Sequence, residues 1–457
     1  MNVPVANRPL PGAQTLPNGL LQQGRPIFPP YVGALEGIGG WIATIFTLPT
    51  FCAAFDFYLS SLGFTKMMGI LALIICLLTG AFKVFTNNGA GRVYLFLTFW
   101  FIAAVPFAVW RGGSIILLQQ YWVIALACFV AVAGLLVSFQ QVRRALLLYA
   151  WGVVITSVMI YKYGTIDPQV GRIILDNTRF TDSNDIGMVC IASLPLIAFH
   201  MRTPKLNGFW KFACLMGLLV VLGAFSKTGS RGGFLALIGL GLYLFWRGSF
   251  INKVKLAAVT VMIVLASAAF LPPELRQRYI TFKTEDTGDP DDMNAGASSE
   301  SRMHLFWESV DVTLRNPIFG VGPGNFMIEE NNRAKGAGYI RGMWHATHNT
   351  YTEISSEAGI PALIAYVWLL CWCWTTLSKL EKPENSRWHP EAAQIPSMAF
   401  ALKACLLTIM VSSTFLSITY HTKMPTLVGL VVAFTLAVSR ENEHYRREYA
   451  ARGSLAA

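Results

Sequence analysis

Charged residues are scarce in this chain. Only 13% of its 457 residues are Asp, Glu, Lys or Arg, whereas 54% are hydrophobic. Soluble domains typically carry about 25% charged residues. Charge is missing above all from a series of apolar runs of roughly 20 residues, the length that crosses a bilayer as a helix. These runs exclude a soluble globular protein and indicate a polytopic membrane protein.

Cysteine is absent from every hydrophilic segment. All eight cysteines lie within apolar runs, so we expect no disulfide framework, even in a loop that faces an oxidising compartment. Cys371 and Cys373 flank a Trp, and we interpret them as small buried hydrophobic residues. A cleavable signal peptide is also missing from residues 1–38, which are rich in Pro and Gly. We expect this segment to be a disordered cytoplasmic tail.

The period-two alternation of a membrane barrel strand is missing too, which leaves a helical bundle as the spanning structure. We therefore predict an all-α protein with about 12 transmembrane helices. Asp56 and Pro49 interrupt the first apolar run, so the first two runs could instead form one kinked hairpin. The expected spans are 39–64, 67–86, 92–111, 114–138, 144–163, 185–201, 209–225, 231–247, 254–271, 355–378, 397–419 and 423–439.

The distribution of Lys and Arg predicts the orientation. With the N-terminus in the cytoplasm, most basic residues outside the longest loop fall in cytoplasmic segments. Topology and anionic lipid then explain the net charge of +11, and no nucleic-acid partner is expected. The predicted segments are a cytoplasmic tail (1–38), spans one to nine (39–271), a large periplasmic loop (272–354), spans ten to twelve (355–439) and a second cytoplasmic tail (440–457).

The large loop is the longest polar segment, and a loop of that length is usually functional. Within it, Ser301–Arg315 has the apolar stripe of an amphipathic helix, which Ser298 or Ser299 would cap and Pro317 would end. The next segment, NPIFGVGPGNF, has the glycines of a tight loop. No internal repeat is evident.

The most informative stretch is WHATHNTYTEISSEAGIPALIAY, at 344–366, where a polar segment enters an apolar helix. Polar groups at such a boundary are costly and indicate a functional site. His348, beside Asn349, is a candidate general base, because its ordinary pKa near 6.5 lets it take a proton from a hydroxyl at neutral pH. A purely structural histidine is the alternative. His345 and Glu353 could also complete a metal site with His348.

Two arginines are candidate anion ligands. Arg231 lies in SKTGSRGGF at the start of the eighth expected span, where glycines and a helix N-terminus favour an anion. Snorkelling to lipid headgroups would also explain it. Arg302 begins the loop helix, with Trp307 about one turn further on. Its guanidinium either pairs with a nearby Glu or binds the same anion as Arg231.

The loop at 164–184 adds further candidates. It ends in RFTDSNDIG, where Asn184 and Asp185 stand at a natural helix cap. Arg179 and Arg172 could line the path of an anionic substrate. In the large loop, three aspartates could bind a divalent cation or simply belong to a flexible acidic segment; they are Asp289, Asp291 and Asp292.

Arg231, Arg302 and His348 fall on the same predicted face of the membrane. Two fixed cations and one base suit glycosyl transfer from a lipid diphosphate, because the cations neutralise the departing diphosphate while the base activates an acceptor hydroxyl. This chemistry needs neither metal nor cofactor.

These stretches resemble the O-antigen ligase and polymerase superfamily of bacterial envelope proteins. The matching stretches are RFTDSNDIG, TGSRGGFLALIGLGLYLF, the helix from Arg302 to Trp307, NPIFGVGPGNF and HNTYTEISSEAGIPALIAY. The resemblance implies a twelve-span inner-membrane protein with both termini in the cytoplasm and its active site in the periplasm. It implies catalytic roles for His348, Arg302 and Arg231. Expected substrate-binding residues are Asn349, Arg179, Asn184, Glu357 and Trp307.

The resemblance further implies transfer of a glycan from an undecaprenyl-diphosphate carrier to an acceptor hydroxyl, without metal. Ligases, which use lipid A-core, polymerases, which use another glycan, and protein O-oligosaccharyltransferases share these motifs; we favour the ligase type. A transporter of lipid-linked sugars would need charges deep in several spans and internal symmetry, whereas only Asp56 and Lys403 lie clearly within spans. A non-catalytic scaffold would not need the polar stretch at 344–357.

Overall fold

Helices make up nearly all of the described chain in this computed structural model. It describes residues 32–59, 61–167, 172–204, 206–251, 253–254, 290–336 and 345–455, with side chains for all of these except 167, 290–301, 336 and 452–455. The helices are α1 (Ala34–Thr47), α2 (Ala53–Leu59), α3 (Phe64–Thr79), α4 (Val84–Asn87), α5 (Gly89–Ala104), α6 (Arg111–Leu117), α7 (Val123–Leu135), α8 (Phe139–Tyr163), α9 (Ser183–Met201), α10 (Gly208–Lys227), α11 (Arg231–Arg247), α14 (Pro290–Arg315), α15 (Phe326–Gly336), α16 (Thr350–Leu380), α17 (Ile395–Ser412) and α18 (Lys423–Leu455).

The expectation of an all-α membrane protein is confirmed, but the structure does not give the predicted count of twelve spans. Among the described residues, eight helical stretches are long and apolar enough to cross a membrane, and two bent pairs raise the number to as many as ten. One bend lies within the first expected span, which Pro49 and Asp56 interrupt: the helical stretch Ala34–Thr50 meets α2 at 91°. α11, which corresponds to the expected span 231–247, has 17 residues and is not among these eight stretches. The predicted span 254–271 lies outside the described residues except for residue 254.

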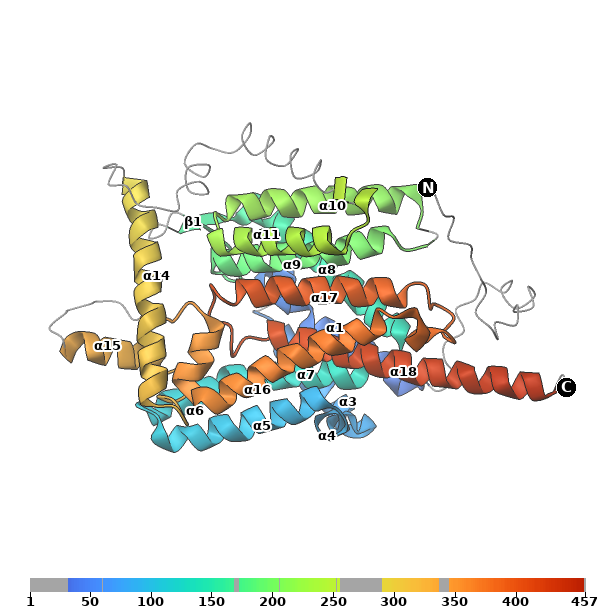
Figure 1. Cartoon of the computed structure of the whole chain (residues 1–457), viewed down its shortest axis with the longest axis horizontal. Helices are drawn as coiled ribbons and strands as arrows, with labels where there is room; N and C mark the ends of the chain where they lie inside the picture. The colour runs from blue at the N-terminus through green and yellow to red at the C-terminus, as the bar shows by residue number, and fades with distance from the viewer. Residues whose placement is uncertain are drawn as a thin grey trace, which may run out of the picture.

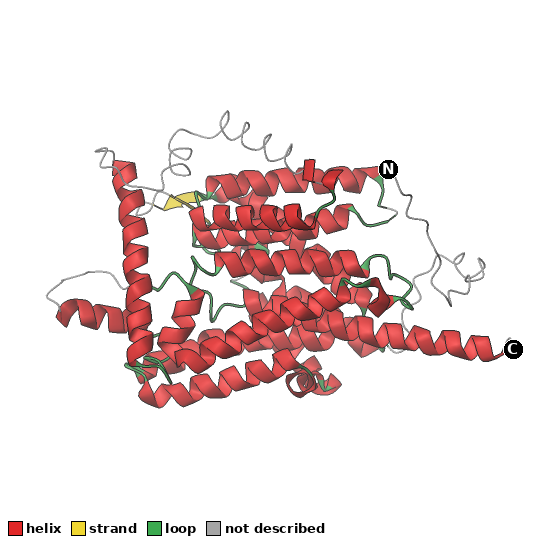
Figure 2. Ribbon diagram, viewed as in Figure 1, coloured by secondary structure: helices red, strands yellow, loops and turns green. Residues whose placement is uncertain are grey.

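Most helices run side by side along the long axis of the molecule, and α14 crosses one end of this bundle (Figure 1). The C-terminal part of α18 extends from the opposite end. Two short strands, β1 (Thr165–Asp167) and β2 (Arg172–Ile174), form an antiparallel hairpin at the α14 end (Figure 2). The sequence did not predict this hairpin.

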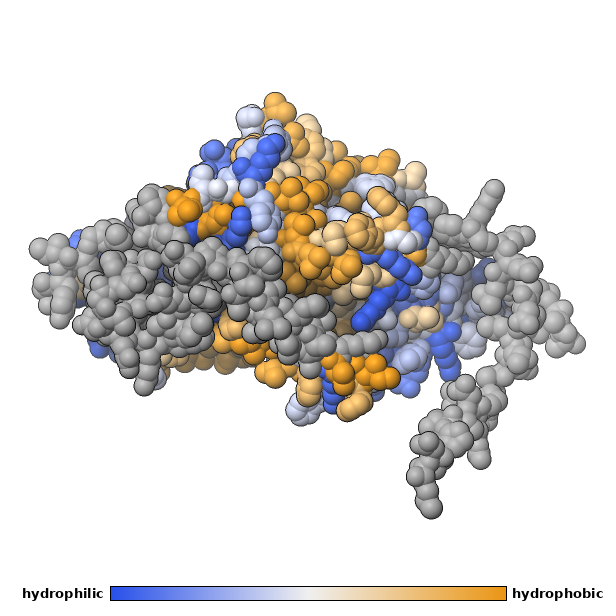
Figure 3. All heavy atoms as spheres, turned by 90° about the horizontal axis from the view of Figure 1, so that it is seen from above, coloured by the Kyte–Doolittle hydropathy of each residue, from blue (hydrophilic) through white to orange (hydrophobic). Residues whose placement is uncertain are grey.

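The surface of the bundle is apolar where a bilayer would contact it. Large side chains such as Phe99, Leu77 and Leu219 are exposed on α5, α3 and α10, and hydrophobic residues cover much of the flank that Figure 3 shows. This surface fits lipid rather than water. All eight cysteines are free. Cys373 is buried, as predicted, whereas Cys371 is exposed, so the interpretation of Cys371 as a buried residue is wrong.

The helix of the large loop is longer than predicted. α14 begins at Pro290, so the prediction that Ser298 or Ser299 caps it is wrong. Proline suits a first helical position, because it has no N–H and its φ is already helical. The predicted end before Asn316–Pro317 is confirmed.

A tight turn, residues 316–326, fits into a break in α16. Gly359 has a φ of 83°, which interrupts the helix and frees backbone groups on both sides. Val321 N donates to Ser356 O at 2.8 Å, and Ile360 N donates to Pro317 O at 2.8 Å. A Cβ on Gly359 would come within 1.9 Å of the Ile318 carbonyl oxygen, so the close contact requires glycine. This contact places the loop helix on the bundle.

Candidate active site at the α14 end of the bundle

His348 lies immediately before the first turn of α16. Its φ of 51° is unusual for a residue other than glycine and costs of the order of 1 kcal/mol. Asn349 caps the helix, because its Oδ1 accepts hydrogen bonds from Tyr351 N at 2.9 Å and Thr352 N at 3.2 Å. Thr347 Oγ1 fixes the segment from the other side by pairing with Ser417 Oγ at 2.9 Å. The imidazole therefore projects from a strained but well-anchored backbone.

Two arginines act on the charge of this imidazole. Burial, followed by the positive charges of Arg302, His345 and Arg172, lowers the pKa of His348 from its ordinary 6.5 to about 4. Arg302 belongs to α14 and Arg172 to β2, so segments far apart in sequence bring charge to one histidine. His348 is consequently neutral at pH 7, the form that a general base requires.

Asp182 lies in the same group of charges. It is the residue that caps α9, since its Oδ1 accepts a hydrogen bond from Asn184 N at 2.8 Å. The prediction that Asn184 or Asp185 caps this helix is wrong by two or three positions. Burial raises the pKa of the Asp182 carboxyl, and Arg172 and Arg302 both act against that rise. Both guanidinium groups therefore lie near Asp182 as well as near His348.

Asn184 joins Arg172 to the start of α11. Its Oδ1 accepts hydrogen bonds from Arg172 Nη1 at 3.2 Å and from Ser230 Oγ at 2.9 Å. Ser230 caps α11 and directly precedes Arg231, which is half-buried. Sequence reasoning mentioned Arg172 only as part of a substrate path, and it missed the role of Ser230 as a helix cap. The signal for Ser230 was present, since a Ser before a glycine-rich helix start is a typical cap.

The glycines beside Arg231 serve packing within the protein. A Cβ on Gly232 would come within 2.8 Å of the Phe415 side chain, and one on Gly233 within 2.7 Å of Phe225. The sequence had suggested that these glycines let a ligand approach. In the structure, they let two aromatic rings approach.

For two of the predicted substrate-binding residues, the structure describes other surroundings. Arg179 pairs with Asp56 of α2, with 3.3 Å between Nε and Oδ2. Trp307 is 62% exposed. It follows Arg302 by five residues, so the two side chains leave α14 roughly 140° apart.

Glu357 is buried inside the protein, with 4% of its surface exposed. Its Oε2 accepts hydrogen bonds from Gly324 N at 2.8 Å and from Tyr420 OH at 2.9 Å, and its Oε1 accepts one from Phe326 N at 3.2 Å. All three partners belong to this chain. They tie α16 to the 316–326 turn and to the segment before α18.

Within the described residues, no group of three or more His, Cys, Asp or Glu side chains could hold a metal ion. Glu353, the suggested third ligand beside His345 and His348, accepts hydrogen bonds from Thr419 N at 3.1 Å and Thr419 Oγ1 at 2.6 Å. Asp289 lies outside the described residues, and so do the side chains of Asp291 and Asp292.

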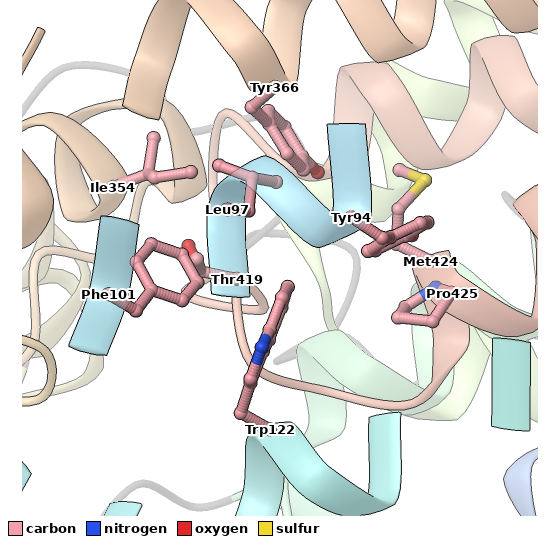
Figure 4. A pocket seen from close by; sticks show the side chains of 9 residues that line it. All are labelled: Tyr94, Leu97, Phe101, Trp122, Ile354, Tyr366, Thr419, Met424 and Pro425. Carbon is pink, nitrogen blue, oxygen red and sulfur yellow. The ribbon is translucent and has the colours of Figure 1, made fainter. Parts of the chain in front are cut away.

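A small pocket lies deeper in the bundle, next to Thr419 (Figure 4). It contains no charged side chain, so its lining does not suit a diphosphate. The residues that line it are Tyr94, Leu97, Phe101, Trp122, Ile354, Tyr366, Thr419, Met424 and Pro425.

The bundle thus presents arginines and a neutral histidine at one end of a set of membrane helices. Residues 212–367, from α10 into α16, match the O-antigen ligase family. This range is an O-antigen ligase domain. A comparison with curated proteins found no match. The chain is therefore a multi-pass membrane enzyme with an O-antigen ligase domain, and this domain contains Arg231, Arg302 and His348.

Proposed function

We propose that the protein transfers a glycan en bloc from undecaprenyl diphosphate to an acceptor hydroxyl, of the lipid A-core type, at the periplasmic face of the bacterial inner membrane. The observation that carries this proposal is the shared environment of His348, Arg302 and Arg172, which combines a neutral base with two fixed cations. The O-antigen ligase domain supports it independently.

His348 accepts the proton of the acceptor hydroxyl as that oxygen attacks the anomeric carbon of the donor sugar. The bond between this carbon and the diphosphate oxygen breaks, and the bonding electrons leave with the lipid diphosphate. Arg302 and Arg172 stabilise the charge that develops there, because a guanidinium binds phosphate oxygens in a planar fork. Arg231, next to the Ser230–Asn184–Arg172 chain of hydrogen bonds, completes the anion site.

Among the remaining candidates, Asn349 would set the position of His348 through the helix cap. Asn184 would do the same for Arg172. Arg179 and Trp307 would contact the outer part of the glycan or the acceptor, since both are exposed. The reaction as written uses no metal and no nucleotide.

The orientation rests on the charge distribution. Segments at the end of the bundle opposite α14 hold most of the basic residues outside the large loop, which favours a cytoplasmic location for that end and for both termini. The site would then face the periplasm. A polymerase or a protein O-oligosaccharyltransferase would use the same site with another acceptor.

Purified protein in liposomes, given a lipid-diphosphate glycan and a lipid A-core acceptor with EDTA and without ATP, tests the proposal. We expect ligated product from the wild type and a loss of at least 100-fold in Arg302→Gln and His348→Ala. Arg315→Gln and His304→Ala, on the same loop helix, are matched controls and should retain activity. Movement of intact carrier across the bilayer without product would instead show a transporter.

A further inference from the structure

Glu357 was predicted to bind substrate, yet all the hydrogen bonds described for its carboxylate go to other parts of this chain. Gly324 N, Phe326 N and Tyr420 OH all donate to it. A buried carboxyl group with three such donors is a strong anchor, because removing an acceptor oxygen leaves a buried N–H or O–H without a partner. The segment that it anchors most directly is the 316–326 turn.

This turn packs against α14. Val321 and Phe326 form a separate buried apolar cluster with Leu305 and Val312 of α14. Both turn residues are positioned by α16: Val321 N donates to the Ser356 carbonyl at 2.8 Å, and Phe326 N donates to the Glu357 carboxylate at 3.2 Å. Leu305 stands three residues after Arg302, so the cluster lies within one turn of the guanidinium.

We propose that Glu357 is a positioning residue that sets the distance between Arg302 and His348. It does so by holding Phe326 in place against the apolar side of α14. This inference rests on the function proposed above. Glu357 and His348 flank the first two turns of α16, so one short rigid segment fixes both the base and the support of its neighbouring cation.

The position of Arg302 is sensitive to small tilts of α14. Arg302 lies 13 residues before the end of α14, or about 20 Å along the helix axis. A tilt of roughly 5° at the 316–326 turn would move Arg302 by about 2 Å, and a misplacement of about 1 Å can cost of the order of 100-fold in rate. A small loss of support at Phe326 is therefore enough to impair the site without unfolding the protein.

The charges that face His348 supply a specific readout. They are Arg302 from α14, Arg172 from β2 and His345 from its own segment, with Asp182 of the α9 cap beside both arginines. If α14 moves away, His348 becomes easier to protonate. The acid limb of the kcat/KM profile then moves to higher pH, whereas simple loss of folded protein lowers the rate at every pH.

The test measures pH–rate profiles of glycan transfer for Glu357→Gln, Phe326→Ala and Arg302→Gln in liposomes. In Glu357→Gln, an amide NH2 replaces one of the two acceptor oxygens. We expect the first two variants to lose of the order of 100-fold in kcat and to shift the acid limb in the same direction as Arg302→Gln. Combining Glu357→Gln with Arg302→Gln should shift the limb no further than Arg302→Gln alone.

Glu353→Gln is the matched control, because Glu353 is a buried carboxylate one turn earlier that holds Thr419 and not the 316–326 turn. It should leave the acid limb in place. An unmoved limb in Glu357→Gln, or a shift equally large in Glu353→Gln, would overturn the positioning role. Failure of the proposed function is a different result: Arg302→Gln would itself keep full activity with an unmoved limb.

Discussion

Binding of the donor should make His348 a stronger base. In the free enzyme, Arg302 and Arg172 contribute to holding the pKa of His348 at about 4. In the proposed reaction, the donor diphosphate neutralises these cations when it binds, and removing one like charge within roughly 4–6 Å shifts a pKa by about one unit or more. We therefore expect a value of about 5 to 6 in the donor complex, closer to the working pH and better suited to proton abstraction.

Steady-state kinetics separate the two states, since kcat/KM reports the free enzyme and kcat reports the complex. With saturating acceptor and varied donor, the acid limb of kcat/KM should lie near pH 4 and the limb of kcat at least about one pH unit higher. In Arg302→Gln, the kcat/KM limb should move up and the gap between the two limbs should narrow. The reasoning would be refuted if the acid limbs of kcat/KM and kcat coincided near pH 6.5 and neither moved in Arg302→Gln.

Three further predictions concern single residues. Asn184→Ala leaves Arg172 and Ser230 without their shared acceptor, so kcat/KM for the donor should fall about 10- to 100-fold; an unchanged value would contradict the link. Gly359→Ala should cost about 3 kcal/mol or more and deplete the protein from membranes, because its φ is positive and Ile318 O is in the way, whereas the Gly241→Ala control, with open space around it, should be neutral. The thermal stability of the purified protein should fall as pH drops from 6.5 towards 4, because in this range His348 is protonated in the unfolded chain but neutral in the folded protein. A fall equally steep in His348→Gln would rule out His348 as the cause.

The sequence was sufficient for the fold class because runs of about 20 apolar residues admit one structure in a bilayer. Local chemistry also indicated that the first span is interrupted and that α14 ends before Asn316–Pro317. Other features depend on tertiary contacts. The break in α16 at Gly359 exists because the 316–326 turn packs into it, and nothing local to α16 reveals that partner.

The sequence could name candidate site residues one by one but not their arrangement. His348 and Arg302 were identifiable because polar groups stand out beside apolar helices. Arg172 stood in a short loop with no visible partner, and only the folded chain shows that it shares the environment of His348. Glu357 was chosen as a substrate ligand because a carboxylate in an apolar run suggests a site; its three donors come from segments that the sequence could not bring together.

The central claim is that arginines from distant segments and His348 form one environment. Labelling of His348 by diethyl pyrocarbonate, followed by mass spectrometry across pH, measures the protonation of that one imidazole directly. The account predicts a midpoint near pH 4 in the wild type, and a higher midpoint in Arg302→Gln and in wild type with bound undecaprenyl diphosphate. A midpoint near pH 6.5 that neither change moves would contradict it.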